Sequence, residues 1–181
     1  MQSIRPILLI ALVASLVATP SCSPLTPATP ASPPSTKETR IADEVHNVIN
    51  HYRASQGLGP LTRHKGLDKL AHNHSDYLRV KNGGFGIYGN KISHFKFEWR
   101  AQQAATQYGF RKLGENVAFM KVKPQSQAHH LLILWVASDG HRKNIHGDWT
   151  HSGVGIAITE NGDIIATQLF GSKGESSSTS Q

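Results

Sequence analysis

Residues 153–171 read GVGIAITENGDIIATQLFG, and this stretch decides the fold. Residues 154–159 are rich in β-branched side chains, which favour strands. Asn161 and Gly162 are typical of the two-residue loop of a β-hairpin, and we predict a type I′ turn at this pair. Residues 164–170 return as the partner strand. The chain therefore closes its folded domain with an antiparallel hairpin.

Upstream of the hairpin, apolar side chains recur with the period of a helix. In the stretch that begins at Glu38 they fall at i, i+3, i+4 and i+7, and Gln56 with Gly57 ends this helix. A second helix begins near residues 64–66 and carries a similar apolar stripe. His74 lies on that stripe, where a histidine is more often a hydrogen-bonded core residue than a ligand. The first part of the domain is therefore predicted to be helical.

Two more helices and a strand follow. Residues 98–108 predict a helix that Gly109 ends, and residues 127–137 predict a strongly apolar helix that is buried on most sides. Residues 113–120 predict a short strand, and the glycine-rich residues 82–90 predict a loop. Helices that precede a final antiparallel hairpin indicate an α+β layered domain rather than βαβ units.

The N-terminal end is not part of this domain. Residues 1–22 have a basic start, an apolar stretch and a small-residue end, as a secretory signal peptide does. Cys22 is the only cysteine in the chain, which excludes an intrachain disulfide, and its position predicts lipidation as in a bacterial lipoprotein. Thr19 stands where such a signal normally has an aliphatic residue, so ordinary cleavage after Ala18 stays open.

Composition sets the remaining boundaries. Residues 23–37 are dominated by proline, serine and threonine and predict a semi-extended linker. Residues 172–181 are polar and predict a disordered tail. The folded domain is therefore expected over residues 38–171.

Charge and motifs argue against several functions. The net charge of +7 is spread without a basic run, which favours weak attraction to anionic cell surfaces and argues against nucleic-acid binding. The chain lacks the H-E-x-x-H pattern of a zinc protease helix and the G-x-S-x-G turn of a hydrolase. Ser138, Asp139 and His141 lie too close in sequence to converge as a catalytic triad.

Polar residues at the ends of predicted elements form a different candidate site. His94 follows the glycine-rich loop, Glu115 stands at the start of a predicted strand, and His141 follows the apolar helix. Two imidazoles and a carboxylate from three elements would suit an open zinc site. Because the chain has eleven histidines, spacing by itself does not select this group.

Six segments in this order resemble the CAP superfamily, which comprises cysteine-rich secretory proteins, antigen 5, pathogenesis-related 1 proteins and SCP-like extracellular proteins. The chain is most similar to the bacterial, cysteine-poor branch, over residues 41–171. The segments are VINHYRASQGLGPL at 48–61, GLDKLAHNHSDYL at 66–78, ISH at 92–94, YGFRKLGENVA at 108–118, LWVASDGHRKNI at 134–145, and the closing hairpin.

The resemblance implies a fold and a site. The fold is a three-layer α-β-α sandwich with a central antiparallel sheet. The site is a cleft that holds zinc or another divalent cation in some relatives. Carried over by motif, the metal-binding residues are His94, Glu115 and His141, and the cleft-supporting residues are Ser93, Asn116, Ser138 and Arg142.

Two departures from the family pattern bear on this site. Many relatives carry a second glutamate just after the residue that corresponds to Trp135, and this chain has no acid at the equivalent place. Bacterial relatives often carry an arginine before the glycine-aromatic pair, and Arg100 lies too far upstream to match it. A complete four-residue site is therefore not expected.

We expect a secreted or cell-envelope-anchored protein that binds an extracellular ligand in this cleft, with a divalent metal as an optional cofactor. One alternative is a metal-assisted hydrolase of peptide or envelope substrates, in which Glu115 acts as the general base. Another is lipid or sterol binding in an apolar groove, with residues 83–88 as a flap. Cys22 would add a membrane tether. The sequence does not decide whether the chain is an enzyme.

Overall fold

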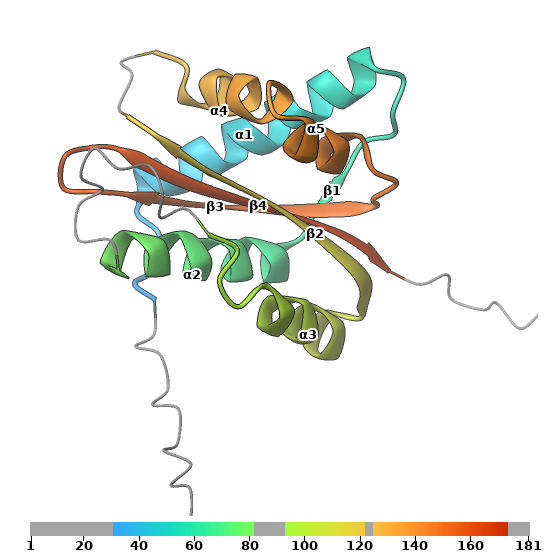
Figure 1. Cartoon of the computed structure of the whole chain (residues 1–181), viewed down its shortest axis with the longest axis horizontal. Helices are drawn as coiled ribbons and strands as arrows, with labels where there is room; N and C mark the ends of the chain where they lie inside the picture. The colour runs from blue at the N-terminus through green and yellow to red at the C-terminus, as the bar shows by residue number, and fades with distance from the viewer. Residues whose placement is uncertain (1–30, 82–92, 122–124, 174–181) are drawn as a thin grey trace, which may run out of the picture.

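A four-stranded sheet lies between two layers of helices, as Figure 1 shows. The computed structural model describes residues 31–81, 93–121 and 125–173. The predicted signal peptide, the lipidation site Cys22, the loop at residues 82–90 and most of the predicted tail lie outside the described residues. The predicted α+β class and three-layer architecture are confirmed.

The strands are β1 at Thr62–Arg63, β2 at Phe110–Met120, β3 at His151–Ile158 and β4 at Ile164–Lys173. They form one sheet in the order β1-β3-β4-β2. Strands β3 and β2 pair with β4 in antiparallel fashion, and β1 pairs in parallel with the first two residues of β3. This short parallel edge strand does not appear in the sequence pattern.

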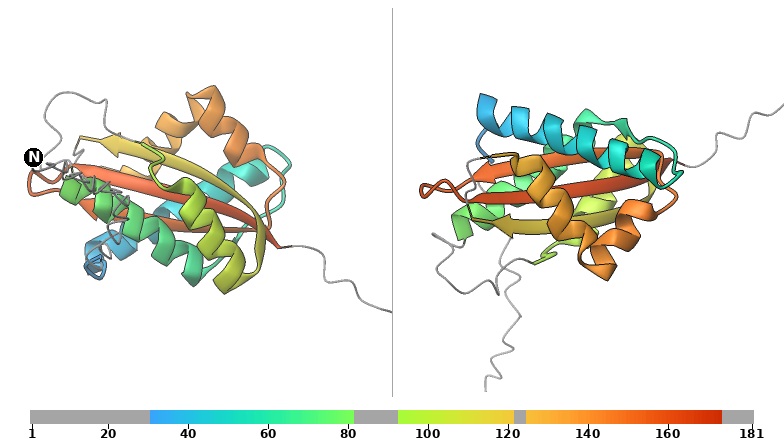
Figure 2. Two further views of the ribbon diagram at one scale, coloured as in Figure 1. Left: turned by 60° about the horizontal axis from the view of Figure 1, so that its bottom comes forward. Right: turned by 90° about the horizontal axis from the view of Figure 1, so that it is seen from above.

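The helices divide between the two faces of the sheet, which Figure 2 shows from either side. One face carries the largest apolar cluster, in which the buried Trp135 and Phe170 pack together with side chains of the first helix. The other face carries two smaller clusters around Leu67 and Leu78. Helices α1 (Thr36–Ser55), α4 (Gln127–Val136) and α5 (Asp139–His146) cover the first face, and α2 (Lys65–Lys81) and α3 (Phe97–Tyr108) cover the second.

Helix α1 begins at Thr36, two residues before the predicted start at Glu38. Ser35 is its N-cap and forms a capping box with Glu38, in which each side chain bonds the backbone N–H of the other residue. Ser35 is therefore part of the sequence pattern that starts the helix, although the composition of residues 23–37 places it in the predicted linker. The predicted ends of the first and third helices, at Gln56 and Gly109, are confirmed.

The hairpin turn differs from the prediction. The amide of Thr159 donates to the carbonyl of Asp163, so three residues separate the paired positions instead of two. Among the described residues of this turn, Gly162 has a positive φ of 82°, whereas a type I′ turn needs positive φ at both central residues. The type I′ prediction is therefore wrong, and the turn is a three-residue loop that ends in a left-handed glycine.

Two further predictions about elements are corrected. Helix α4 is not buried on most sides, because Ile133 and Leu134 are 62% and 44% exposed. Strand β2 begins at Phe110 rather than near Leu113, so Glu115 lies inside the strand instead of at its start. Within the described residues, no helix combines the length and hydrophobicity needed to cross a lipid bilayer.

Candidate functional site

Glu115 is a buried carboxylate at the centre of the candidate site. Its side chain is 1% exposed. Arg100 binds it with two nitrogens, Nε at 2.7 Å from Oε2 and Nη2 at 2.8 Å from Oε1. His94 Nδ1 lies 2.8 Å from Oε1. The carboxylate therefore has a cation on one side and an imidazole on the other, which satisfies a charge that burial would otherwise penalise.

The elements around β2 explain how these side chains meet. Strand β2 lies at the edge of the sheet, and its alternation turns Glu115 toward the α2–α3 layer. Arg100 lies on the inner face of α3 with Ala104, one turn further along. Arg100 also donates through Nη1 to the carbonyl of Phe95, 2.8 Å away, and so holds the backbone that carries His94.

Arg100 belongs to the site, although its place in the sequence does not predict this. It lies too far upstream to match the arginine of the family motif. A signal for it exists in the sequence, since an arginine on the buried stripe of an amphipathic helix needs a buried partner. Here that partner is Glu115.

The balance of effects lowers the pKa of Glu115. Burial by itself raises this pKa, but the hydrogen bonds from His94 and Arg100 and the charge of Arg100 outweigh it. The pKa of Glu115 therefore lies below its usual range, and the group is a carboxylate at neutral pH. In this state it accepts the Nδ1–H of His94, which leaves Nε2 as the unprotonated nitrogen of a neutral ring, on a side chain that is 55% exposed.

His74 completes this side of the site. Its Nε2 lies 2.9 Å from the carbonyl oxygen of Ser93 and 4.0 Å from Glu115 Oε1. Burial, followed by the charge of Arg100, lowers the pKa of His74 to about 4. His74 is therefore neutral at pH 7, and its contact with Glu115 is not an ion pair. The prediction of a hydrogen-bonded core histidine is confirmed.

Asn116 points to the opposite face of the sheet and holds α5. Its Nδ2 donates to the carbonyl of His141, 3.1 Å away, and its Oδ1 accepts from Asn144 Nδ2 at 2.9 Å. Asn144 Nδ2 also lies 3.0 Å from the carbonyl oxygen of Glu115. These bonds attach α5 to the free edge of β2, where backbone groups would otherwise lack partners. Asn116 therefore supports the site through α5.

His141 lies in the first turn of α5. The sequence pattern instead predicts a loop after α4 at this position. The helical conformation is interrupted between α4 and α5 at Ser138, which is the N-cap residue of α5. Asp139 and Gly140 are already helical. Burial lowers the pKa of His141, and the charge of His94 lowers it further. The two imidazoles therefore interact across the edge of β2, although their chain segments pack on opposite faces of the sheet.

The other predicted supporting residues have structural contacts. Arg142 donates to the carbonyl of Val136 at 2.9 Å and pairs with Asp139 at 2.5 Å, so it caps the end of α4. Ser93 contributes its carbonyl to His74. The side chain of Ser138 makes no capping bond to α5.

The donor set does not fit the predicted three-residue metal site. Within the described residues, no group of three His, Cys, Asp or Glu side chains could hold a metal ion. Glu115 gives the physical reason, because Arg100 occupies both of its oxygens and compensates its charge. That leaves His94 and His141 as candidate ligands, fewer than the three protein ligands of an open zinc site.

Comparison with known proteins now identifies the family. The model of the cysteine-rich secretory protein family, CAP, matches residues 46–170. The chain belongs to the CAP family. This CAP domain is 31% identical over 132 residues to the Bacillus subtilis protein YkwD, a match that covers 71% of this chain and 46% of YkwD.

Solved structures support the same fold. An extracellular protein with an SCP domain from Bacillus anthracis superposes with a TM-score of 0.58 at 24% identity, over 79% of this chain and 45% of that protein. An outer surface protein from Borrelia burgdorferi superposes with a TM-score of 0.57 at 19% identity, over 79% of this chain and 98% of that protein. The chain thus spans less than half of YkwD and of the Bacillus anthracis protein.

Proposed function

We propose that this CAP domain is an extracytoplasmic binding module whose contact point is the exposed imidazole of His94. One observation carries the proposal: a fully buried, charge-compensated carboxylate holds a half-exposed histidine in a fixed tautomer and orientation. A hydrogen bond from a buried carboxylate fixes the orientation of an imidazole before the imidazole contacts a ligand. The extracellular and outer-surface descriptions of the structural relatives support the location.

The chemistry of the site favours a polar ligand. His94 presents Nε2 to solvent, and His141 lies near enough for the two ring charges to interact. Because burial lowers the pKa of His141, this second imidazole is neutral at pH 7. His141 can therefore accept and donate hydrogen bonds without adding charge. Phe95 and Trp99 follow His94 by one and five residues and add exposed aromatic surface.

The hydrolase alternative finds less support. A general base works best when its pKa lies near the working pH, and Glu115 has a lowered pKa and a bidentate bond to Arg100. Binding of zinc or another divalent cation by the two imidazoles stays a prediction for titration, as does binding of a lipid or sterol. Neither is required for His94 to contact a polar ligand.

A matched pair of histidine variants tests the proposal. His94→Gln removes the presented ring, whereas His51→Gln removes an exposed histidine of α1, on the other face of the sheet. Co-sedimentation is measured with purified peptidoglycan and with phosphatidylethanolamine–phosphatidylglycerol vesicles, with and without zinc. We expect one of these envelope materials to bind the parent and His51→Gln equally, and His94→Gln about tenfold more weakly. Equal binding by all three proteins, or no binding by the parent, contradicts the proposal.

A further inference from the structure

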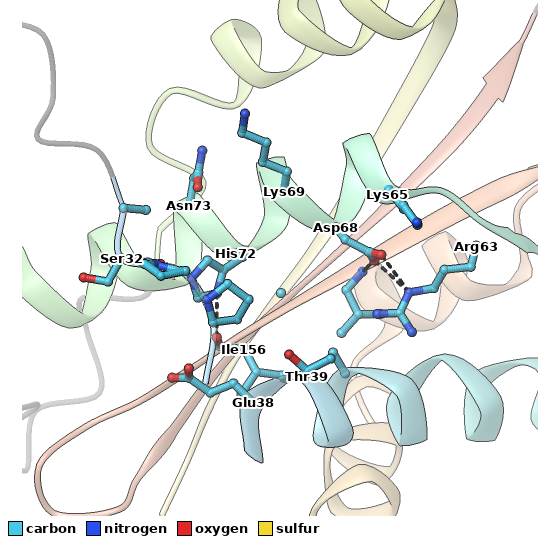
Figure 3. Close-up of a pocket in the computed structure, with 16 residues that line it drawn as sticks. Ser32, Glu38, Thr39, Arg63, Lys65, Asp68, Lys69, His72, Asn73 and Ile156 are labelled. Carbon is cyan, nitrogen blue, oxygen red and sulfur yellow. Dashed lines mark hydrogen bonds and ion pairs between the residues drawn. The ribbon is translucent and has the colours of Figure 1, made fainter. Parts of the chain in front are cut away.

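A hollow of about 440 Å³ lies between α1 and α2, at the edge of the sheet that is away from β2. Figure 3 shows His72 of α2 at this hollow, with Ser32 next to the ring. Residues 31–34 line the same end of the hollow and lead directly into α1. One wall of the hollow therefore belongs to the segment that precedes α1, and not to a helix or a strand.

Among the described residues, a single hydrogen bond holds residues 31–34 on the domain. It joins the carbonyl oxygen of Ser32 to His72 Nε2 over 2.7 Å. Ser32 is exposed, and the two prolines that follow it have no N–H to donate. From Ser35 onward the capping box of α1 fixes the chain. His72 therefore provides the polar contact that keeps this short segment in place.

Both ring nitrogens of His72 face a carbonyl oxygen. Nδ1 lies 2.9 Å from the carbonyl oxygen of Ile156 in β3, and Nε2 lies 2.7 Å from that of Ser32. A carbonyl oxygen can only accept a hydrogen bond, and a neutral imidazole has a single N–H. The neutral ring can therefore satisfy one of these oxygens, whereas the protonated ring donates to both.

Burial decides which of the two bonds the neutral ring keeps. Ile156 is 1% exposed, so its carbonyl group would lose a hydrogen bond in the interior, where that loss is costly. Ser32 is exposed, so its carbonyl group can turn to water instead. The neutral ring therefore keeps its proton on Nδ1, and the lone pair of Nε2 then faces the oxygen of Ser32.

Charged side chains surround His72, but among the described residues none of them bonds its ring. Glu38 and Asp68 accept from amides of β3, and Asp68 also pairs with an arginine. Histidine is the side chain whose charge ordinarily changes between pH 5 and pH 8, and His72 is the histidine that lines the hollow. The charged side chains near it are Glu38 on α1, Arg63 on β1, and Lys65, Asp68, Lys69 and Asp76 on α2, and residues 154–156 of β3 add none.

We propose that residues 31–34 form a pH-sensitive latch, which closes when protonated His72 donates to both Ser32 and Ile156 and opens when the ring becomes neutral. Release adds these residues to the free part of the predicted linker and extends its reach by up to about 13 Å. It also uncovers the end of the hollow at His72. The latch lies at the opposite edge of the sheet from the His94 site and does not depend on the function proposed above.

NMR spectroscopy of the full chain tests the latch between pH 5 and pH 8. The ratio of closed to open segment follows from the amide shifts of Ala31 and Ser32, with a synthetic peptide of residues 27–34 giving the shifts of a released segment at each pH. We expect this ratio to be about tenfold higher at pH 5, as one hydrogen bond from a charged donor would give. It should change together with the ring signals of His72, and long-range ¹⁵N spectra should place the proton of the neutral ring on Nδ1. An equal ratio at both pH values overturns the proposal.

Histidine variants show whether His72 is the group that responds. His72→Gln cannot gain a charge, so its ratio of closed to open segment should be the same at pH 5 and pH 8. His51→Gln removes an exposed histidine of α1 and should keep the pH dependence of the parent. A pH dependence that persists in His72→Gln contradicts the latch.

Proline variants test the latch without touching the buried ring, so they remain informative if His72→Gln does not fold. Pro33→Gly/Pro34→Gly makes the released segment more flexible and should lower the ratio of closed to open segment at pH 5 about tenfold. Pro24→Gly/Pro27→Gly makes the same change further along the predicted linker and should leave the ratio unchanged. Equal ratios in the two proline variants would overturn the proposal.

Discussion

At the scale of single residues, the molecule is organised around a buried charge. Glu115 and Arg100 are 1% and 4% exposed, and each satisfies the other with two hydrogen bonds. Such a pair adds little net stability compared with an apolar pair, but removing one partner leaves a buried charge without compensation. The pair also fixes His94, since Arg100 holds both Glu115 and the carbonyl of Phe95.

Arg100→Met should therefore lower the free energy of unfolding by about 3 kcal/mol, because it leaves the Glu115 carboxylate buried and unpaired. Urea unfolding at pH 7 measures the change. The double variant Arg100→Met/Glu115→Leu removes both charges and should recover most of the loss. A single variant as stable as the parent would show that Glu115 does not need this cation.

His74 should make stability fall with acid in a defined window. Its folded pKa of about 4 lies below the unfolded value of 6.5, so the unfolded chain binds the proton more tightly. The contribution of neutral His74 to the free energy of unfolding is fully present above pH 6.5 and is lost as the pH falls toward 4. Between pH 7 and pH 5 the loss should be about 2 kcal/mol.

The variant His74→Gln isolates this effect. Glutamine keeps a donor for the carbonyl of Ser93 but does not titrate. The free energy of unfolding of the parent, measured relative to that of the variant, should therefore fall by about 2 kcal/mol from pH 7 to pH 5. Urea unfolding at both values measures it. An unchanged difference would mean that His74 does not titrate abnormally.

At the scale of elements, close contact between α2 and β3 sets the geometry of one half of the molecule. Glycines at two alternate positions of β3 let the helix backbone touch the strand. The same contact brings Asp68 and His72 to the sheet edge. On the other side, Asn116 and Asn144 attach α5 to β2 through side-chain bonds.

Gly155→Ala should destabilise the fold by about 3 kcal/mol, because its methyl group would overlap the backbone of α2 and both elements would have to move apart. Thermal or urea unfolding measures the effect. Gly59→Ala is the matched control, since nothing lies within 4 Å of a Cβ there, and it should change stability little. Similar stability of the two variants would contradict the close packing of α2.

At the scale of the whole molecule, the two edges of one sheet have different surroundings. The β2 edge carries the histidine site and is covered by α5, and the β3 edge carries the hollow between α1 and α2. Packing on both faces of the sheet holds these edges in place. The chain has a single cysteine, so no intrachain disulfide contributes.

The thermal midpoint of the chain should therefore be the same with and without a reducing agent, in contrast to proteins that rely on disulfides for several kcal/mol. Circular dichroism melts in the presence and absence of dithiothreitol measure this. A lower midpoint under reduction would reveal a stabilising disulfide between two chains through Cys22.

Local patterns predicted the elements better than the contacts between them. The helix that ends at Gln56 and the final hairpin follow from periodicity and turn residues, which each segment carries by itself. The predictions of a type I′ turn and of a helix at residues 127–137 that is buried on most sides were wrong, because turn geometry and solvent exposure depend on how neighbouring segments pack. The start of α5 was missed because Asp139-Gly140 reads as a helix end when only the preceding residues are considered.

The sequence by itself determined the class of fold, through the order of its helices and strands, and its resemblance to the CAP superfamily indicated the family and the histidine and glutamate that meet in the site. Only the tertiary structure decided that Arg100, fifteen residues from Glu115, is the partner of its carboxylate. Only the structure decided that His141 lies in the first turn of a helix on the opposite face of the sheet from Glu115. The alternation of side chains along a strand predicts which residues share a face of the sheet. The partner of a buried charge depends instead on which helices and strands pack together in the folded chain.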